Sequence, residues 1–301
     1  MKLAILSNGG ANYSTKRLKE EALKRGHEVK VISYTKCYMT IEKSDPVVYY
    51  KGKPLSGYDA IIPRIAQRYT GYGSSVVRQF EMQNVYTTAS SIAIVRSRDK
   101  LRTYQLLAKA GVGIPKTVLA RETANFEDVI SLIGEMPLII KVARGTHGNG
   151  VVLAETAKAA KAVMQAFYVE GVNFFVQEFV KESAGMDIRA LVVGGKVVAS
   201  VKRQSLDDDF RSNTHQGGVG LAVKLTPEEE KTAIKAARAM GMPICGVDMM
   251  RSERGPLVLE VNSSASFKTP ELITKRNVAA KVIEYIELNA KRRNRKDKIG
   301  A

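Results

Sequence analysis

The chain has 301 residues, 45% of them hydrophobic, which is ordinary for a globular protein with a buried core. Its 47 Lys and Arg residues outnumber its 30 Asp and Glu residues, giving a net charge of +17. Such an excess favours an anionic partner: a nucleic acid, a nucleotide, a membrane surface or an acidic polypeptide. No apolar run approaches the ~18–20 residues that span a bilayer, which argues against a membrane protein.

The two cysteines, Cys37 and Cys245, lie far apart and have no metal-ligand spacing. A disulfide between them has no support in the sequence, and a reduced, cytoplasmic setting is expected. The opening "MKLAILSNGG" is interpreted as a first strand, because polar residues follow the short apolar run at once.

The first 93 residues predict a small α/β module. Apolar runs at 2–7 and 28–33 indicate buried strands, and the amphipathic stretch at 14–26 between them predicts a helix. A third strand at 58–65, a helix at 74–83 and a short strand at 85–88 follow. A helix that connects two strands is typical of a parallel sheet.

The rest of the chain predicts two further units, 94–179 and 180–290, so the fold class is α/β that becomes α+β in the C-terminal half. Helices are expected at 91–111, 125–135, 156–171 and 227–241, with a last one from about Asn277. Strands are expected at 116–120, 137–143, 151–155, 174–180, 188–195, 196–204, 219–225, 244–252 and 256–262. Gly194 and Gly195 separate two apolar runs and predict a β-hairpin.

The tail at 291–301 carries six basic residues and one acidic residue. It is either the solvated end of the last helix or an electrostatic arm for RNA or an acidic protein.

A lysine and a glycine-rich loop interrupt the strands at 137–143 and 151–155. Lys141 ends the first strand, and Gly145, Gly148 and Gly150 follow it. Glycine lets a backbone approach a phosphate and aim its N–H groups at it, and a lysine nearby neutralises charge. No helix opens after Gly150, so the pattern is neither a Walker loop nor a dinucleotide fingerprint. The loop is either a flap over a ligand or a plain hairpin turn.

Three oxygen-bearing residues lie in two late apolar runs. Glu260 and Asn262 are two residues apart on one strand and therefore face the same side. Asp248 lies opposite them if the two strands pair through the turn "SERGP". Such oxygens suit Mg²⁺ together with nucleotide phosphates and water. The alternative is a polar edge that faces water.

Two other segments carry weaker signals. In "QEFV", Gln177 and Glu178 at a strand end offer backbone groups to an adenine edge, and Asp187 could accept from a ribose hydroxyl. In "KRQSLDDDFRSNTHQGG", Arg211 and Asn213 suit charge on a transferring phosphoryl group. Both segments are equally compatible with exposed polar loops. No catalytic role is assigned to His147 or His215, which lie in the two loops.

In this order and spacing, these features resemble the ATP-grasp superfamily of carboxylate–amine ligases, and within it the RimK-type ribosomal protein–glutamate ligases. The likeness runs over about residues 1–290 and is carried by "MKLAILS", "YKGKPL", "IIPRI", "RQFEM", "RDKLRTYQLLAKAG", "GVVLAET", "GGKVVASVKRQ", "DFRSN" and "GPLVLEVN". It implies a Rossmann-like pre-ATP-grasp domain at 1–93, a central ATP-grasp subdomain with the flap at 94–179, and a C-terminal subdomain with the metal site at 180–290.

The resemblance also implies roles for individual residues. Those expected to bind ATP are Lys100, Lys141, Gly145, Thr146, Gly148, Gly150, Gln177, Glu178, Phe179, Asp187, Arg211, Ser212 and Asn213. Those expected to hold two Mg²⁺ or Mn²⁺ ions are Asp248, Glu260 and Asn262. Those expected to stabilise the transferring charge are Arg203, Arg211 and Asn213.

The implied activity is the addition of L-glutamate to the C-terminal tail of a ribosomal protein through an acyl phosphate, with release of ADP and phosphate. A homo-oligomer, such as a tetramer, is implied as well, and nucleic-acid contact would be secondary. One segment departs from the family pattern. After "EVN" the family has a Ser-Pro-Gly stretch, whereas residues 263–277 read "SSASFKTPELITKRN", with extra basic residues at Lys268, Lys275 and Arg276. Two other hypotheses therefore stay open: a related ligase that extends a small molecule or carrier, and an inactive scaffold that binds RNA or the ribosome.

Overall fold

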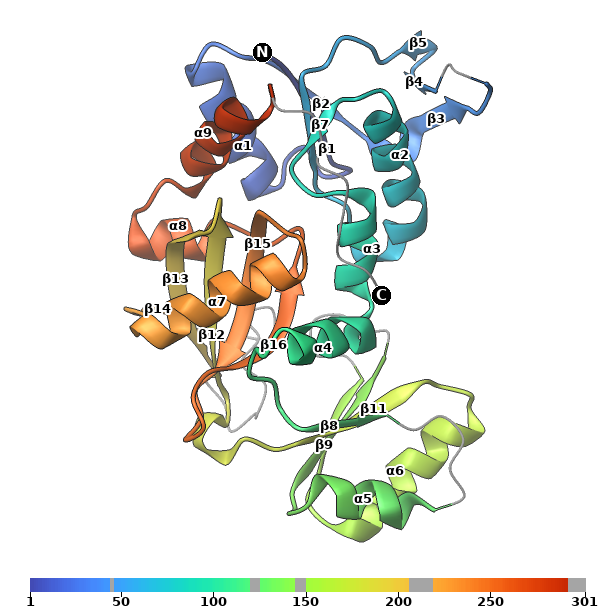
Figure 1. The fold of residues 1–301 in the computed structure, drawn as a ribbon, viewed down its shortest axis with the longest axis vertical. Coiled ribbons are helices and arrows are strands. Elements are labelled where there is room, and N and C mark those ends of the chain that lie inside the picture. The colour runs from blue at the N-terminus through green and yellow to red at the C-terminus, as the bar shows by residue number, and fades with distance from the viewer. Residues whose placement is uncertain (44–45, 120–124, 144–149, 206–218, 292–301) are drawn as a thin grey trace.

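The computed structural model describes residues 1–43, 46–119, 125–143, 150–205 and 219–291. Three sheets with their covering helices follow one another along the chain, and a small antiparallel sheet is attached to the first (Figure 1). Within the described ranges, no helix is both long enough and apolar enough to cross a membrane.

The N-terminal module is built on a parallel sheet, as the sequence predicts, and its four strands follow the order β2-β1-β6-β7. Its strands are β1 (Lys2–Leu6), β2 (Glu28–Ile32), β6 (Ala60–Pro63) and β7 (Tyr86–Thr87), and its main helices are α1 (Tyr13–Lys24) and α2 (Thr70–Met82). The chain moves from β1 to β2 on one side and then returns to β6 on the other side of β1. The strand order therefore reverses between β1 and β6, and ligands of open α/β sheets bind at the carboxyl edge of such a point.

Residues 37–54 form a small antiparallel sheet that the sequence analysis missed. Its strands are β3 (Cys37–Thr40), β4 (Val47–Tyr50) and β5 (Lys53–Pro54). Tyr38 and Tyr49 lie directly opposite each other, and their rings stack with centroids 5.5 Å apart.

The prediction of a single helix at 91–111 is wrong, because the helix is interrupted at Asp99. Two helices are present instead, α3 (Ser91–Arg98) and α4 (Lys100–Lys109). Asp99 is extended, with φ −96° and ψ 102°, and its carboxylate accepts a hydrogen bond from the backbone N–H of Arg102. Asp99 is therefore the N-cap of α4, and the cap places Lys100 at the first helical position.

The central module is an antiparallel sheet in the order β10-β9-β11-β8. Its elements are β8 (Thr117–Leu119), α5 (Phe126–Ile133), β9 (Leu138–Val142), β10 (Val151–Ala154), α6 (Ala157–Val169) and β11 (Phe174–Glu178). Apolar residues of α5 and α6 pack on this sheet and form a core separate from the other clusters. In Figure 1 this module stands apart at the bottom of the molecule.

The C-terminal module is a five-stranded antiparallel sheet in the order β14-β13-β12-β15-β16. Its elements are β12 (Met186–Val193), β13 (Lys196–Gln204), β14 (Val219–Ala222), α7 (Pro227–Ala239), β15 (Ile244–Met250), β16 (Leu257–Asn262), α8 (Lys268–Thr274) and α9 (Val278–Asn289). The predicted hairpin joins β12 to β13, and the positive φ angles of Gly194 and Gly195 fit a type I′ turn.

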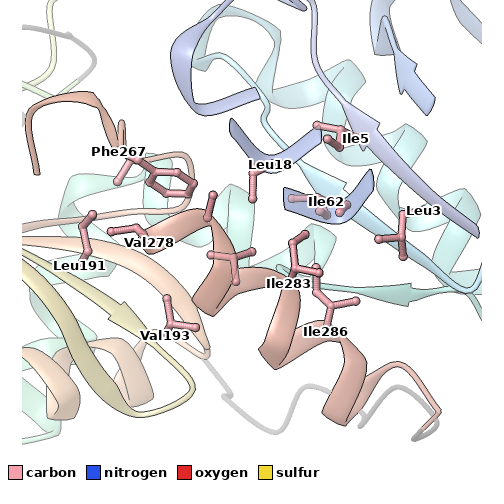
Figure 2. Close-up of a cluster of buried hydrophobic side chains, with 14 of the residues drawn as sticks. Leu3, Ile5, Leu18, Ile62, Leu191, Val193, Phe267, Val278, Ile283 and Ile286 are labelled. Carbon is pink, nitrogen blue, oxygen red and sulfur yellow. The ribbon is translucent and has the colours of Figure 1, made fainter. Parts of the chain in front are cut away.

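Alternate residues of β12 face opposite sides of this sheet. Ile188 and Ala190 pack with α7, whereas Leu191 and Val193 pack with α9. Figure 2 shows the second cluster, in which α9 lies between the N-terminal and C-terminal sheets. Its labelled members are Leu3, Ile5, Leu18, Ile62, Leu191, Val193, Phe267, Val278, Ile283 and Ile286. One continuous core therefore fixes the first and third modules relative to each other.

Candidate active site

The three residues predicted to bind metal lie together on two neighbouring strands. β15 and β16 pair in antiparallel fashion, with Asp248 directly opposite Glu260. The side-chain nitrogen of Asn262 lies 2.7 Å from Glu260 Oε1 and 3.5 Å from Asp248 Oδ2. The pairing expected from the turn "SERGP" is therefore confirmed, and it gathers two carboxylates and an amide on one face of the sheet.

Two arginines on the adjoining strands hold Asp248. Arg189 Nε and Nη2 donate to the two Asp248 oxygens at 2.7 and 2.6 Å, and Arg203 Nη2 lies 3.0 Å from Oδ2. Burial, which leaves Asp248 2% exposed, would raise the pKa of this carboxyl, but the two guanidinium groups keep it well below its ordinary value. Asp248 is therefore ionised at all ordinary pH values.

Glu260 has the opposite electrostatic setting. Burial raises its pKa, the negative charge of Asp248 raises it further, and the Asn262 amide lowers it only in part. A cation between the two carboxylates would relieve this repulsion, and their oxygens together with the Asn262 amide oxygen are the hard donors that Mg²⁺ prefers. The residues therefore fit a magnesium ion. Over the described ranges, no cluster of three or more His, Cys, Asp or Glu side chains could hold a metal, so the amide is needed to complete the set.

Two lysines from different elements, α4 and β9, converge near this site. Lys100 Nζ, at the start of α4, lies 3.4 Å from the carbonyl oxygen of Val142 and 6.0 Å from the centre of the Phe175 ring. Lys141 on β9 pairs with Phe175 on β11. Burial and the charge of Lys100 lower the pKa of Lys141 to about 8, and Glu260 opposes this shift. Burial also lowers the pKa of Lys100.

A cation at the first position of a helix is unfavourable, because the helix N-terminus is itself positive. The dipole of α4 therefore does not stabilise the positive charge of Lys100. Two desolvated lysines that also repel each other provide an electrostatic site for an anion.

Of the predicted glycine loop, only Gly150 belongs to the described part of the chain, and Gly145, Thr146, His147 and Gly148 lie outside it. Gly150 has φ +74°, and a Cβ added there would come within 2.3 Å of Val142 Cγ2. Its carbonyl accepts a hydrogen bond from the Val142 N–H. Glycine at 150 is therefore required by the turn itself, whatever the loop binds.

The residues of "QEFV" lie at the end of β11 in the central sheet. The Gln177 side chain is 1% exposed and donates to Thr117 Oγ1 at 2.7 Å. The Glu178 N–H donates to the Lys116 carbonyl, and its carboxylate accepts from the Lys116 N–H and from Arg254. Phe179 follows at the strand end and is partly buried. Gln177 thus braces the sheet, and Glu178 connects it to the turn between β15 and β16.

Asp187 lies on β12 and forms a two-pronged ion pair with Arg203, which faces it on β13. Both residues are 6% exposed. Arg203 thus bridges Asp187, the predicted ribose ligand, and Asp248, the predicted metal ligand. The predicted phosphate residues Arg211, Ser212 and Asn213, together with His215, lie outside the described residues.

Sequence reasoning missed Arg189, Arg64 and Arg98. Arg189 is two residues from Asp187 inside an otherwise apolar strand, the same signal that identified Glu260 and Asn262. Arg64 directly follows the strand β6, and Arg98 ends the helix α3. Nothing in their local spacing separates these two from ordinary surface arginines.

Family models match nearly the whole chain. A model described as the RimK PreATP-grasp domain matches residues 1–94, and one described as the RimK-like ATP-grasp domain matches residues 97–286. The first range contains the parallel N-terminal sheet, and the second contains the two antiparallel sheets with Lys141 and the carboxylates.

Similar proteins agree with these matches. The "probable alpha-L-glutamate ligase" of Hydrogenovibrio crunogenus is 52% identical over 296 residues, and that of Photobacterium profundum is 51% identical over 296 residues. Each alignment covers 98% of both chains. The structure of the ATP-grasp ligase PsnB complexed with minimal precursor, Mg and ADP has the same fold, with a TM-score of 0.74 at 17% identity over 97% of this chain and 98% of that one. Two matched domain models and relatives identical at half of their positions lead to one conclusion: the chain belongs to the RimK family of ATP-grasp ligases, which are ATP-dependent enzymes.

Proposed function

We propose that the protein joins L-glutamate to the C-terminal carboxylate of an acceptor protein at the expense of ATP, and that the acceptor is a ribosomal protein. The observation that carries this proposal is the approach of Lys100 on α4 to β9, the strand that carries Lys141, beside the Asp248–Glu260 pair on β15 and β16. Positive groups for phosphates and oxygens for a divalent cation are what phosphoryl transfer from ATP needs. The names of the relatives at about half identity support glutamate as the added amino acid.

In this proposal, the nucleotide lies between the central and C-terminal modules. Lys100 and Lys141 bind its phosphates, and a contact to the adenine edge is assigned to the Glu178 carbonyl and to Phe179. The Glu178 N–H is left out because it is already bonded to Lys116. The ribose contact of Asp187 requires one of its oxygens to be shared with Arg203. Arg211, Ser212 and Asn213 keep their predicted role beside the phosphates.

Asp248, Glu260 and Asn262 would hold magnesium, and the family pattern favours two Mg²⁺ or Mn²⁺ ions. Bound there, the ions would neutralise phosphate charge and so favour phosphoryl transfer. Arg189 and Arg203 keep Asp248 ionised and fix its position, so that its oxygens are ready for a cation.

The reaction has two balanced steps. A carboxylate oxygen of the acceptor attacks the γ-phosphorus of ATP, and ADP leaves to give an acyl phosphate. The amine of glutamate then attacks the acyl carbonyl, loses a proton and displaces inorganic phosphate to give an amide. The protein supplies position and charge, and no side chain is needed as a nucleophile.

The charge of +17 supports an acidic acceptor, because a tail that gains glutamates becomes more negative with each cycle. A homo-oligomer, such as a tetramer, is part of the same proposal and is tested by sedimentation.

The test measures ADP release with ATP, Mg²⁺ and each of the twenty amino acids, with and without a recombinant ribosomal-protein acceptor. The intact mass of the acceptor is recorded in parallel. We expect glutamate-dependent ADP release and mass steps of one glutamate residue. ADP release with an unmodified acceptor would move the search to small-molecule acceptors. ATP binding without turnover under every condition would overturn the proposal and favour a binding scaffold.

A further inference from the structure

Arg64 and Arg98 meet where the N-terminal sheet reverses its strand order. Arg64 directly follows β6, and its backbone N–H donates to the carbonyl of Leu6 at the end of β1. Its side chain therefore starts from the carboxyl edge between β1 and β6. Arg98, at the end of α3, reaches the same edge and donates from Nη2 to the Ile65 carbonyl at 2.9 Å. Open α/β sheets bind their ligands at this edge.

Neither guanidinium forms an ion pair with a carboxylate among the described residues. The Arg64 guanidinium lies over the Phe267 ring, 5.2 Å from its centre. Arg98 Nε is buried without a hydrogen-bond partner. Three other arginines that are partly or fully buried, Arg17, Arg189 and Arg203, each contact a carboxylate, whereas the buried Arg96 donates to the Met240 carbonyl.

The electrostatics of the pair favour an anionic partner. Burial, with the charge of Arg98, lowers the pKa of Arg64 to about 10. Burial also lowers the pKa of Arg98, and the charge of Glu260 opposes that shift. Two desolvated cations side by side destabilise the folded protein unless a negative partner joins them.

The surroundings connect this pair to the active site. Ser263 follows the predicted metal ligand Asn262, and its hydroxyl accepts a hydrogen bond from that of Ser97, next to Arg98. A small cavity beside Arg64 is lined by Ser263, Ala265 and Phe267, which belong to the segment where the sequence departs from the family pattern. The first turn of α1 supports this segment, because the Phe267 N–H donates to Ser14 Oγ.

We propose that Arg64 and Arg98 bind a carboxylate of the acidic substrate, one that is not itself activated, at the interface of the N-terminal sheet with the segment after β16. This inference rests on the proposed function and adds a specificity site to it. A glutamate that donates its amine keeps both carboxylates intact, and an acceptor that ends in glutamate keeps its side-chain carboxylate. Guanidinium forks suit such groups, whereas the proposed ligands of the ATP phosphates are Lys100 on α4 and Lys141 on β9.

Direct binding separates this site from catalysis. Glutarate has two carboxylates and no amine, and calorimetric titration of the full-length protein with glutarate measures carboxylate binding without turnover. We expect Arg64→Gln and Arg98→Gln each to weaken glutarate binding about tenfold or more, since a charge-assisted hydrogen bond is lost. Arg64→Lys, which keeps the charge but loses the fork, should show a smaller loss.

The matched control is Arg68→Gln. Arg68 lies four residues from Arg64 and also covers an aromatic ring, that of Tyr69 at 4.7 Å, but it is exposed. It should bind glutarate like the parent protein. The melting temperature distinguishes binding from a structural role: without ligand, Arg64→Gln and Arg98→Gln should melt at the same or a higher temperature, because a partly buried charge without a carboxylate partner is removed. Glutarate should raise the melting temperature of the parent more than that of either variant.

Steady-state kinetics identify the source of the carboxylate. A rise in KM for glutamate with an unchanged KM for ATP assigns the site to the incoming amino acid, and a rise confined to the acceptor KM assigns it to the acceptor. Unchanged glutarate affinity in both variants, or no glutarate binding by the parent, overturns the inference even if the parent is an active glutamate ligase. Arg-dependent glutarate binding by a protein that never turns over glutamate would overturn the proposed function and leave the inference standing.

Discussion

Glu260 and Asp248 place two negative charges side by side in a buried site. Because folding raises the pKa of Glu260 above its unfolded value, the stability that its protonated form contributes is present at low pH and is lost as the pH rises through the folded pKa. At neutral pH the ionised side chain therefore opposes folding. A cation bound between the two carboxylates would balance this charge.

Glu260→Gln should separate stability from activity. Without added Mg²⁺ at neutral pH, we expect the variant to melt at the same or a higher temperature than the parent, because the repulsion from Asp248 is gone. The rate of ADP release should fall about 100-fold or more, since a negatively charged ligand of the metal is lost. Glu253→Gln, in the turn between β15 and β16, is the control. Full Mg²⁺-dependent turnover in Glu260→Gln would contradict the assigned metal role.

Lys141 should make ATP binding pH-dependent. Its pKa of about 8 means that the ammonium loses its proton as the pH rises through that value, and the neutral amine binds phosphate less well. We expect ATP affinity, measured without Mg²⁺, to fall between about pH 7 and 9.5 and the fall to be absent in Lys141→Arg, whose guanidinium stays charged. An identical pH profile in both proteins would exclude Lys141 as the titrating group.

At the scale of single elements, the N-cap of α4 connects local structure to the site. Asp99→Ala should lower the free energy of unfolding by about 0.5–2 kcal/mol, because the Arg102 N–H loses its acceptor. It should also raise the KM for ATP, since Lys100 is the next residue. Asp99→Ser, which can cap the helix, should restore stability. Denaturant titration and ADP-release kinetics measure the two effects, and a normal KM for ATP in an unstable Asp99→Ala protein would show that the cap does not position Lys100.

The sequence predicted most elements well, and the exceptions have physical causes. The break at Asp99 was missed because helix-forming residues continue on both sides of it, and only the cap geometry separates α3 from α4. The strands β3 to β5 were missed because they are short and form a local sheet without a long alternating run. α8 was missed because no side chain caps its N-terminus, and its C-cap is Lys275, which has φ +54°.

The candidate site was predictable where its residues share a strand or a motif. Glu260 and Asn262 follow the two-residue repeat of a strand, so their common face could be deduced from the sequence. Arg64 and Arg98 could not be found this way, because only the three-dimensional fold joins the end of β6 to the end of α3. The pairing of Arg203 with both Asp187 and Asp248 likewise depends on the strand order β13-β12-β15.

At the scale of the whole molecule, the helix α9 holds the first and third modules together. Ile283 is fully buried between them, whereas Ile133, which is 5% exposed, belongs to the core of the central module. Ile283→Ala should lower the free energy of unfolding by about 2–5 kcal/mol and reduce amide-exchange protection in both β1 and β12. Ile133→Ala should reduce protection in β9 and β11 alone. Equal loss of protection in all modules for both variants would contradict the separate cores.

The separate core of the central module has a consequence for how such enzymes diversify. Lys141 belongs to that self-contained unit, while Arg64, Arg98 and the altered 263–277 segment belong to the jointly packed remainder. After gene duplication, one copy could therefore acquire a new acceptor by changes in the remainder while the central module, with Lys141, stays unaltered. Chimaeras that exchange residues 117–178 between relatives should keep the acceptor preference of the parent that supplies the rest of the chain.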